Sequence, residues 1–319
     1  MPLRRAFTLG AAFLAMSLAT PLVHAQGASA GAPLRFVVPF PPGDGLETAA
    51  RVLVDLVAKD LNTTIVIDNR PGASGAIAAE TVSRTHDGKT FLVGTTAIMG
   101  ITPFVRTAPY SPADFVPVAK FAHISAVMAI RNEIPARNWA EFVALAKAAP
   151  GKYTYATPGD GTLTHLAMVT LTRHAGIDMV AVPYKGMGPA LQDFVGGRLD
   201  VYTEPAVVQT AKAGKVRAIA VNSAHRLAEL PDVPTYDEAG IKTSSTPWIG
   251  LLAPKGTPPA LNAQLTAAFR KAVSSPEFAS RLPAGIEAAY SNAEDFGKQL
   301  QTEQDLYKRL IGSLNLKLQ

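Results

Sequence analysis

Residues 35–51 read RFVVPFPPGDGLETAAR, an apolar run that passes through a Pro/Gly turn into a pattern of helical spacing. A strand that meets a helix in this way leaves the first N–H groups of the helix without partners inside the helix, and those groups can hold an anion. Asp44 and Glu47 stand at the same helix start and are unfavourable neighbours for an anion. The stretch therefore predicts a ligand-cradling loop with an unusual charge.

Short β-rich runs alternate with helical patterns along the rest of the chain. Within residues 46–61, apolar residues recur at helical spacing and charged residues take the opposite face. The alternation predicts an α/β fold of parallel sheets flanked by helices. The predicted strands are residues 35–40, 64–68, 90–94, 153–156, 179–182, 199–202, 216–221 and 248–253.

The first 25 residues have the three parts of a secretory signal peptide. Arg4 and Arg5 precede the apolar run 6–18, and the small-residue pattern ending at Ala25 resembles a cleavage site. A buried N-terminal helix and an uncleaved anchor are the alternatives, although the apolar run is short for a membrane span. The sequence predicts an exported chain that starts near Gln26.

Composition excludes several classes of function. The chain has 30 Lys and Arg against 25 Asp and Glu, scattered without the basic stripe and interleaved aromatics that nucleic-acid binding needs. It has no cysteine, which excludes disulfides, thiol catalysis and zinc sites built on thiolates. A content of 48% hydrophobic and 17% charged residues is typical of a well-buried α/β chain, and the length favours two lobes.

Two segments are candidates for crossings between those lobes. Residues 115–131 form a long apolar run, and residues 244–253 read SSTPWIGLLA. If the chain crosses at both, the first lobe is built from residues 26–126 and 243–319. The second lobe is then an insertion of residues 127–242.

Four loops rich in small or hydroxyl-bearing residues follow predicted strands. They are residues 41–47, 95–100, 157–165 and 183–188. In open α/β sheets, ligands bind outside the carboxyl ends of the strands. Each loop alone has a turn-only explanation, but four together favour a cleft.

An enzyme is the alternative of a different class. His165 stands beside a predicted cleft loop, and Glu204 follows the predicted strand 199–202. A hydrolase or lyase could use His165 with Glu204 or Asp44, but the sequence has no nucleophile motif and no set of metal ligands. Ligand contact or helix capping by His165 is favoured over general-base duty, and no cofactor and no metal are predicted.

Eight motifs together resemble one family, the Bug or TctC-type receptors of tripartite tricarboxylate transport systems. The resemblance covers nearly the whole chain after residue 25. The motifs are VVPFPPG (37–43), NRPGASG (69–75), DGKTFLVGT (87–95), ATPGDGTLTHL (156–166), VPYKG (182–186), AGKVRAIAV (213–221), LPDVPT (230–235) and GLLAPKGTP (250–258).

The resemblance implies a two-lobed, type II-like periplasmic binding protein, a monomer, in the periplasm of a Gram-negative bacterium. Such a receptor captures a small carboxylate-bearing molecule and delivers it to membrane permease subunits, or signals through a sensor kinase. Family members hold ligand carboxylates with backbone amides and hydroxyls. The family positions correspond here to Phe40, Pro41, Pro42, Gly43, Asp44, Gly45, Leu46, Thr95, Thr96, Thr157, Gly159, Thr162, Thr164, His165, Tyr184, Lys185 and Gly186, to which the position of Glu204 at a strand end adds an eighteenth candidate.

Two departures from the family pattern bear on the ligand. Relatives read PPGG, a small residue, Thr or Ser, and Asp, whereas this chain reads PPGDGLE, and VYTEP at 201–205 replaces a pattern that ends in Asp-Asn. A buried unpaired carboxylate is unfavourable or takes up a proton. If Asp44 points inward, it should repel a dicarboxylate and favour an amino, amide or cationic group.

Overall fold

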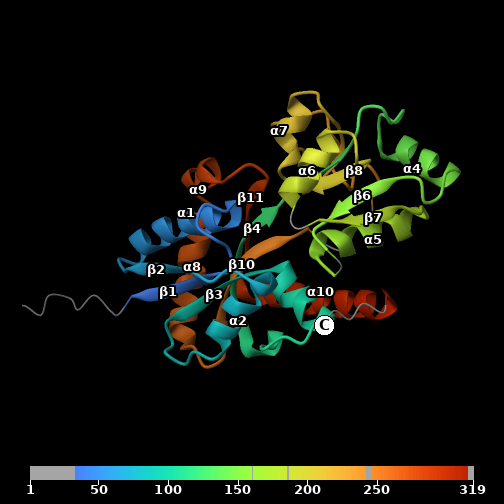
Figure 1. The fold of residues 1–319 in the computed structure, drawn as a ribbon. Coiled ribbons are helices and arrows are strands. Elements are labelled where there is room, and N and C mark those ends of the chain that lie inside the picture. Colours follow the sequence, from blue (N-terminus) through green and yellow to red (C-terminus); the bar gives the residue numbers. More distant parts are fainter. Residues whose placement is uncertain (1–32, 160, 185–186, 242–245, 315–319) are drawn as a thin grey trace, which may run out of the picture. The chain divides into compact units, whose positions relative to one another are not determined.

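The computed structural model describes residues 33–314, apart from 160, 185–186 and 242–245. The predicted signal peptide and the predicted site residues Lys185 and Gly186 lie outside the described residues. The described part consists of two sheets, each with helices on both faces (Figure 1). None of its helices combines the length and the apolar character that a membrane span requires.

The first sheet has six strands in the order β11-β4-β10-β3-β1-β2. β1 pairs in parallel with β2 and β3, whereas β10 pairs antiparallel with β3 and β4, and β11 pairs antiparallel with β4. The strands are β1 (Leu34–Val38), β2 (Ile65–Asn69), β3 (Thr90–Thr95), β4 (Phe115–Ile124), β10 (Trp248–Pro254) and β11 (Ile286–Ser291).

The second sheet has five strands in the order β7-β6-β8-β5-β9. β6 pairs in parallel with β7 and β8, and β5 pairs antiparallel with β8 and β9. The strands are β5 (Ala126–Ile130), β6 (Thr154–Thr157), β7 (Val180–Pro183), β8 (Val201–Glu204) and β9 (Arg217–Asn222).

The helices follow the alternation that the sequence shows. They are α1 (Gly45–Asp60), α2 (Ala76–Ser83), α3 (Thr102–Val105), α4 (Trp139–Ala148), α5 (Leu163–Ala175), α6 (Met187–Val195), α7 (Val207–Lys212), α8 (Pro259–Val273), α9 (Pro276–Arg281) and α10 (Ala293–Leu314). Two short 3-10 helices, η1 (Ala73–Gly75) and η3 (Pro112–Asp114), and a π-helical turn, η2 (Ala97–Ile101), join some of them.

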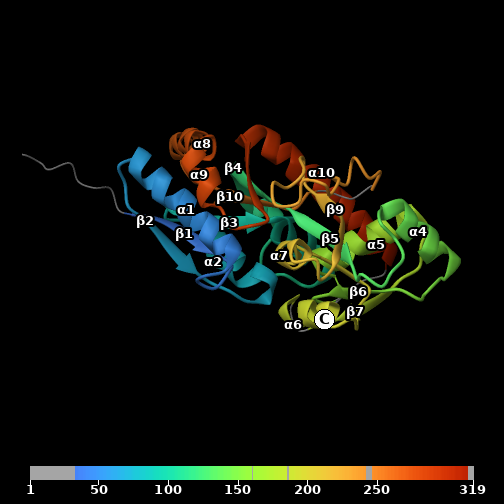
Figure 2. The same cartoon turned by 90° about the horizontal axis from the view of Figure 1, so that it is seen from above.

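Successive side chains of β1 point to opposite faces of the first sheet, and each face has its own hydrophobic core. Phe36 and Val38 pack in one cluster with α1 and α8, whereas Val37 packs in another with α2, Trp248 and Phe296 of α10. Figure 1 shows α1 and α2 on opposite sides of the sheet, and Figure 2 shows α8 across the strands from α2. Burying apolar side chains on both faces fixes the register of β1, because a slip of one residue would exchange the two cores.

The second sheet repeats this arrangement on β5. Met128 and Ile130 pack with residues of α4 and α5, while Val127 and Ala129 pack with residues of α6 and α7. The same strand therefore holds helices on both faces of the second sheet.

The predicted parallel sheets are mixed instead, and the path of the chain gives the reason. β4 leads through Ser125 into β5 of the second sheet, and β10 returns to the first sheet, so β10 runs against its neighbours β3 and β4. β5 runs away from the first sheet and against β8, so β6 and β8 end towards the first sheet. The carboxyl ends of β1, β3, β6 and β8 consequently face one another across the junction.

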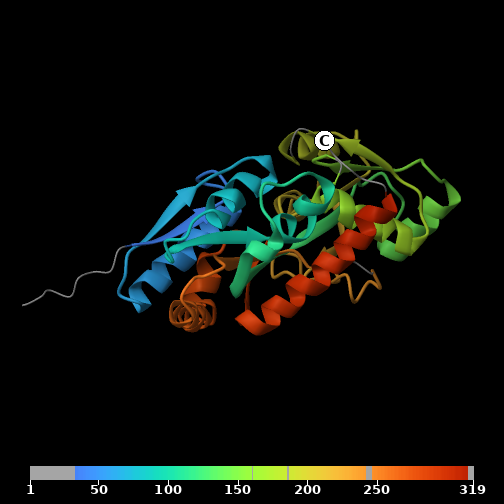
Figure 3. The same cartoon turned by 90° about the horizontal axis from the view of Figure 1, so that it is seen from below.

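A long helix also links the two halves. α10 carries Tyr307 and Ile311, which pack with Ile101, Val105 of α3 and Leu166 of α5. Figure 3 shows α10 extending from beneath the first sheet to α5.

The strand run predicted as 115–131 is divided at Ser125, and β11 was not predicted at all. The lobe boundaries 126/127 and 242/243 stay predictions.

Candidate ligand-binding cleft

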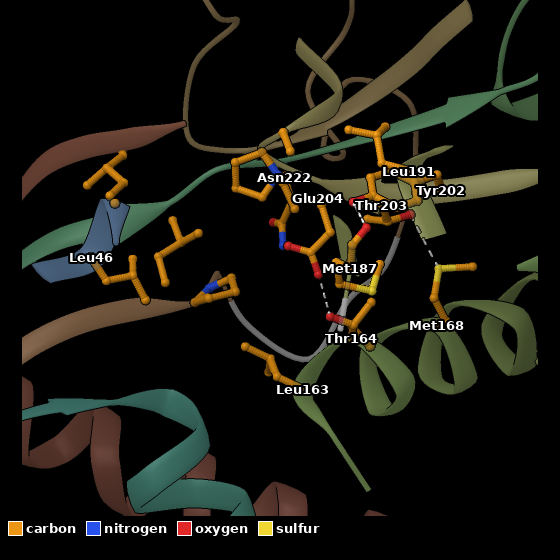
Figure 4. A pocket seen from close by; sticks show the side chains of 18 of the residues that line it. Leu46, Leu163, Thr164, Met168, Met187, Leu191, Tyr202, Thr203, Glu204 and Asn222 are labelled. Atoms are coloured by element: carbon orange, nitrogen blue, oxygen red, sulfur yellow. Dashed lines mark hydrogen bonds between the residues drawn. The ribbon is translucent and has the colours of Figure 1, made fainter. Parts of the chain in front are cut away.

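A cavity of about 510 Å³ lies where the ends of the two sheets meet, a volume within the usual range of small-molecule sites (Figure 4). Elements of both sheets contribute to its wall. The lining residues are Asp44, Gly45, Leu46, Ile124, Ala126, Leu163, Thr164, Ala167, Met168, Leu171, Met187, Gly188, Leu191, Tyr202, Thr203, Glu204, Pro205, Ala206, Asn222, Tyr236, Pro247, Ala284 and Ile286.

The start of α1 is held by the carboxylates of the chain itself. Asp44 is the N-cap residue, and its Oδ1 accepts a hydrogen bond from the Leu46 N–H at 2.8 Å. The Gly43 N–H donates to Glu47 Oε2 at 3.2 Å, and Glu47, only 2% exposed, also forms an ion pair with Arg51. Two N–H groups that were expected to hold a ligand anion are therefore already engaged.

The start of α5 is ordered in a different way, by hydroxyl groups. Thr162 is its N-cap, and the Thr162 hydroxyl accepts from the His165 N–H at 3.4 Å and donates to the Gly159 carbonyl at 2.7 Å. The Thr157 hydroxyl donates to the same carbonyl at 2.9 Å and accepts from the Gly159 N–H at 3.2 Å. Gly159 has a φ of +125°, which other residues rarely adopt. These hydroxyls shape the turn that delivers α5 to the cavity.

His165 is part of this turn. Its side chain is 8% exposed, and its Nδ1 accepts a hydrogen bond from the Gly161 N–H at 3.1 Å. The bond joins His165 to its own turn, and ligand contact or helix capping by His165, which the sequence favours over general-base duty, stays a prediction.

Glu204, at the end of β8, brings a carboxyl group into the apolar cavity. The Thr164 hydroxyl of α5 donates to Glu204 Oε1 at 2.8 Å, and Figure 4 shows the two side chains pointing towards each other. Burial raises the pKa of Glu204 to about 7, and the hydrogen bond from Thr164 opposes part of that rise. Glu204 therefore changes its protonation state near neutral pH.

The structure places five of the eighteen predicted residues in the cavity wall: Asp44, Gly45, Leu46, Thr164 and Glu204. The other described candidates do not line it, and their contact with a ligand stays a prediction. These are Phe40, Pro41, Pro42, Gly43, Thr95, Thr96, Thr157, Gly159, Thr162, His165 and Tyr184.

Three of those candidates have partners elsewhere. Thr96 is 1% exposed and its hydroxyl accepts from the Trp248 N–H at 3.1 Å, while the Thr95 hydroxyl faces the Ile98 N–H at 3.5 Å. The Tyr184 hydroxyl donates to Asp193 at 3.0 Å. These side chains support the loops next to the cavity.

Sequence reasoning missed the apolar part of the wall. Met168 and Leu171 of α5, Met187 and Leu191 of α6, and Tyr236 line the cavity. The four residues on α5 and α6 recur at helical spacing, which also predicts a side of a helix that faces the core. The spacing alone therefore could not show that this side faces a cleft. Among the described residues, no group of three or more His, Asp or Glu is arranged to hold a metal ion.

Comparison with known proteins identifies the family. The pattern of the tripartite tricarboxylate transporter family receptors, TctC, matches residues 49–316, which is most of the chain. This chain belongs to the TctC family. Members of this family are solute-binding receptors, so the hydrolase or lyase alternative is not supported.

Relatives of this TctC receptor cover it almost completely. A protein encoded between tcbD and tcbE in Pseudomonas sp. strain P51 is 33% identical over 93% of this chain and 91% of its own length. A solved structure described as a periplasmic transporter is 34% identical, covers 90% of this chain and 98% of its own, and has a TM-score of 0.75. The adipate complex of Rpa4515 from R. palustris is 29% identical, covers 88% of this chain and 97% of its own, and has a TM-score of 0.74.

Proposed function

We propose that this TctC receptor captures a small organic acid in the cavity between its two sheets, as an exported protein of the periplasm. The observation that supports the proposal is that both halves line the same cavity. The first half contributes α1, and the second half contributes α5, α6 and β8. A solute in contact with both halves stabilises their closed arrangement. The two lobes are proposed to comprise residues 26–126 with 243–319, and residues 127–242.

The solute class follows from two supports. The relative Rpa4515 binds adipate, a dicarboxylate with an apolar middle. In this chain, Leu163 and Thr164 line the cavity in the first turn of the 13-residue helix α5, where backbone N–H groups favour a carboxylate. The proposed partners are the membrane permease subunits of a tripartite tricarboxylate transporter.

The test is isothermal titration calorimetry and thermal unfolding of residues 26–319 with adipate and a panel of mono-, di- and tricarboxylates, with neutral sugars as the comparison. We expect at least one carboxylate to bind. At a concentration about 100 times its Kd, it should stabilise the fold by about 2.7 kcal/mol.

A pair of variants tests the place of binding. Ala167→Phe fills the cavity and should abolish the titration, whereas Ala140→Phe, on the exposed side of α4, should not change it. Binding of sugars alone, or unchanged binding by the Ala167→Phe variant, would contradict the proposal.

A further inference from the structure

The described wall of the cavity has acidic side chains and no basic ones. It contains two carboxyl groups, Asp44 and Glu204, and no Lys, Arg or His. Most of the remaining wall is apolar, with Met168, Leu171 and Met187 among its residues. A solute with two carboxylates would bring negative charge close to Asp44 and Glu204. Among the described wall residues, no cationic side chain would offset that charge.

The two carboxyl groups are not equivalent. Asp44 is committed to capping α1 through the Leu46 N–H. Glu204 receives the Thr164 hydroxyl on Oε1, and a carboxylate can accept about four hydrogen bonds. Glu204 therefore keeps acceptor capacity on the side of the cavity, where an N–H donor of a solute can reach it.

We propose that the solute is a zwitterion, an amino acid with a large apolar side chain, whose ammonium group binds Glu204. The proposal rests on the proposed function and specifies its solute class. The Thr164 hydroxyl and Glu204 Oε1 are 2.8 Å apart, so the first turn of α5 and the carboxyl of Glu204 are close neighbours. In an α-amino acid, a single carbon separates the carboxylate from the ammonium group. The carboxylate could therefore bind the first turn of α5 while the ammonium group binds Glu204.

The apolar part of the wall accounts for the rest of such a solute. Met168 and Leu171 on α5 and Met187 and Leu191 on α6 face the same cavity, and Figure 4 shows Met187 next to Glu204 with Met168 farther along α5. Methionine side chains adapt to apolar groups of different shape. The wall therefore suits branched or aromatic side chains better than a second polar group.

The protonation of Glu204 makes this binding depend on pH. An ammonium group is attracted to the ionised carboxylate and lowers the pKa of Glu204 on binding, whereas a carboxylate solute without an amine favours the protonated form. The affinity for an amino acid should rise about tenfold between pH 6 and pH 8, because the ionised fraction of a group with a pKa of about 7 rises about tenfold. The affinity for the deaminated acid should fall or stay constant.

Other titratable groups near Glu204 must be considered in that experiment. Asp44 from α1, Tyr202 from β8 and Tyr236 line the cavity, and His165 follows Thr164 on α5. Burial raises the pKa of both tyrosines, so neither titrates near pH 7. Lys185 lies outside the described residues.

The test is calorimetry of residues 26–319 with matched pairs of probes: L-leucine against 4-methylpentanoate, and L-phenylalanine against 3-phenylpropanoate. At pH 8 we expect one of the amino acids to bind at least about tenfold more tightly than its deaminated counterpart. Glu204→Gln should remove that advantage, while Glu229→Gln, an exposed change of the same kind, should keep it.

The outcomes separate the two proposals. Equal binding of both members of each pair, tighter binding of the deaminated acids, or an unchanged preference in the Glu204→Gln variant would overturn the zwitterion proposal and leave the receptor function intact. The pH profile of the wild-type protein gives the same decision without a variant. Failure of every carboxylate to bind would overturn both proposals.

Discussion

Replacement of Glu204 by glutamine should make the ligand-free protein more stable at pH 8. Burial among apolar side chains raises the pKa of Glu204 from its ordinary value of 4.5 to about 7. Below pH 4.5, the carboxyl is protonated in both the folded and the unfolded chain, and it has no effect on the pH dependence of stability. Between pH 4.5 and 7, the unfolded chain loses this proton first, so the free energy of unfolding decreases as the pH rises.

Above pH 7 the full effect is about 3 kcal/mol, since a pKa difference of one is worth about 1.36 kcal/mol. Glutamine has nearly the same shape and keeps an oxygen that can accept the Thr164 hydroxyl. The Glu204→Gln variant should therefore gain stability of this order at pH 8, and much less at pH 5.

Urea unfolding followed by circular dichroism at pH 5 and pH 8 measures this difference. Glu229→Gln, on an exposed loop, is the control and should change the free energy of unfolding by no more than about 0.5 kcal/mol at either pH. The reasoning is refuted if the Glu204→Gln variant is no more stable than the wild type at pH 8. It is equally refuted if the gain is the same at both pH values.

Two further substitutions test the other parts of the junction. Asp44→Gly removes a carboxylate from the cavity wall, so the affinity for adipate measured by calorimetry should increase. Because glycine is tolerated at an N-cap, the same change should lower the stability by only a few tenths of a kcal/mol. An unchanged affinity would show that Asp44 does not help to determine the ligand. Gly285→Ala places a Cβ 2.4 Å from Pro205 Cβ at a φ of +79° and should destabilise the fold by about 1–3 kcal/mol more than Gly256→Ala, which has a similar φ and open surroundings. Urea unfolding of both glycine variants measures that difference, and equal losses would show that the contact with Pro205 has no energetic effect.

The sequence predicted most of the fold because its strands carry strong local signals. Each of the eight predicted runs corresponds to a strand of the structure. β11 was missed because residues 286–291 carry little hydrophobic alternation and pair as an edge strand, so their strand state depends on β4. The run 115–131 was not divided because the change of partner at Ser125, whose N–H donates to the Gly285 carbonyl at 2.7 Å, is a tertiary event.

The candidate site was predictable in its loops but not in its side chains. The rule that ligands bind at the carboxyl ends of strands predicted Asp44, Thr164 and Glu204 as site residues, and all three line the cavity. It could not show that the Thr157 and Thr162 hydroxyls bond within their own loop, or that Met168 faces the cavity. Those facts depend on side-chain directions that residue type and spacing leave open.

The cap of α1 has a consequence for any anionic solute that approaches this side of the cavity. The carboxylate of Asp44 is a competitor that is covalently attached beside the Leu46 N–H. Competitors tethered by a short link act at effective concentrations of about millimolar or more. Dilution does not remove a competitor that is part of the chain. The Asp44 carboxylate therefore always competes with a solute anion for the Leu46 N–H at this end of α1.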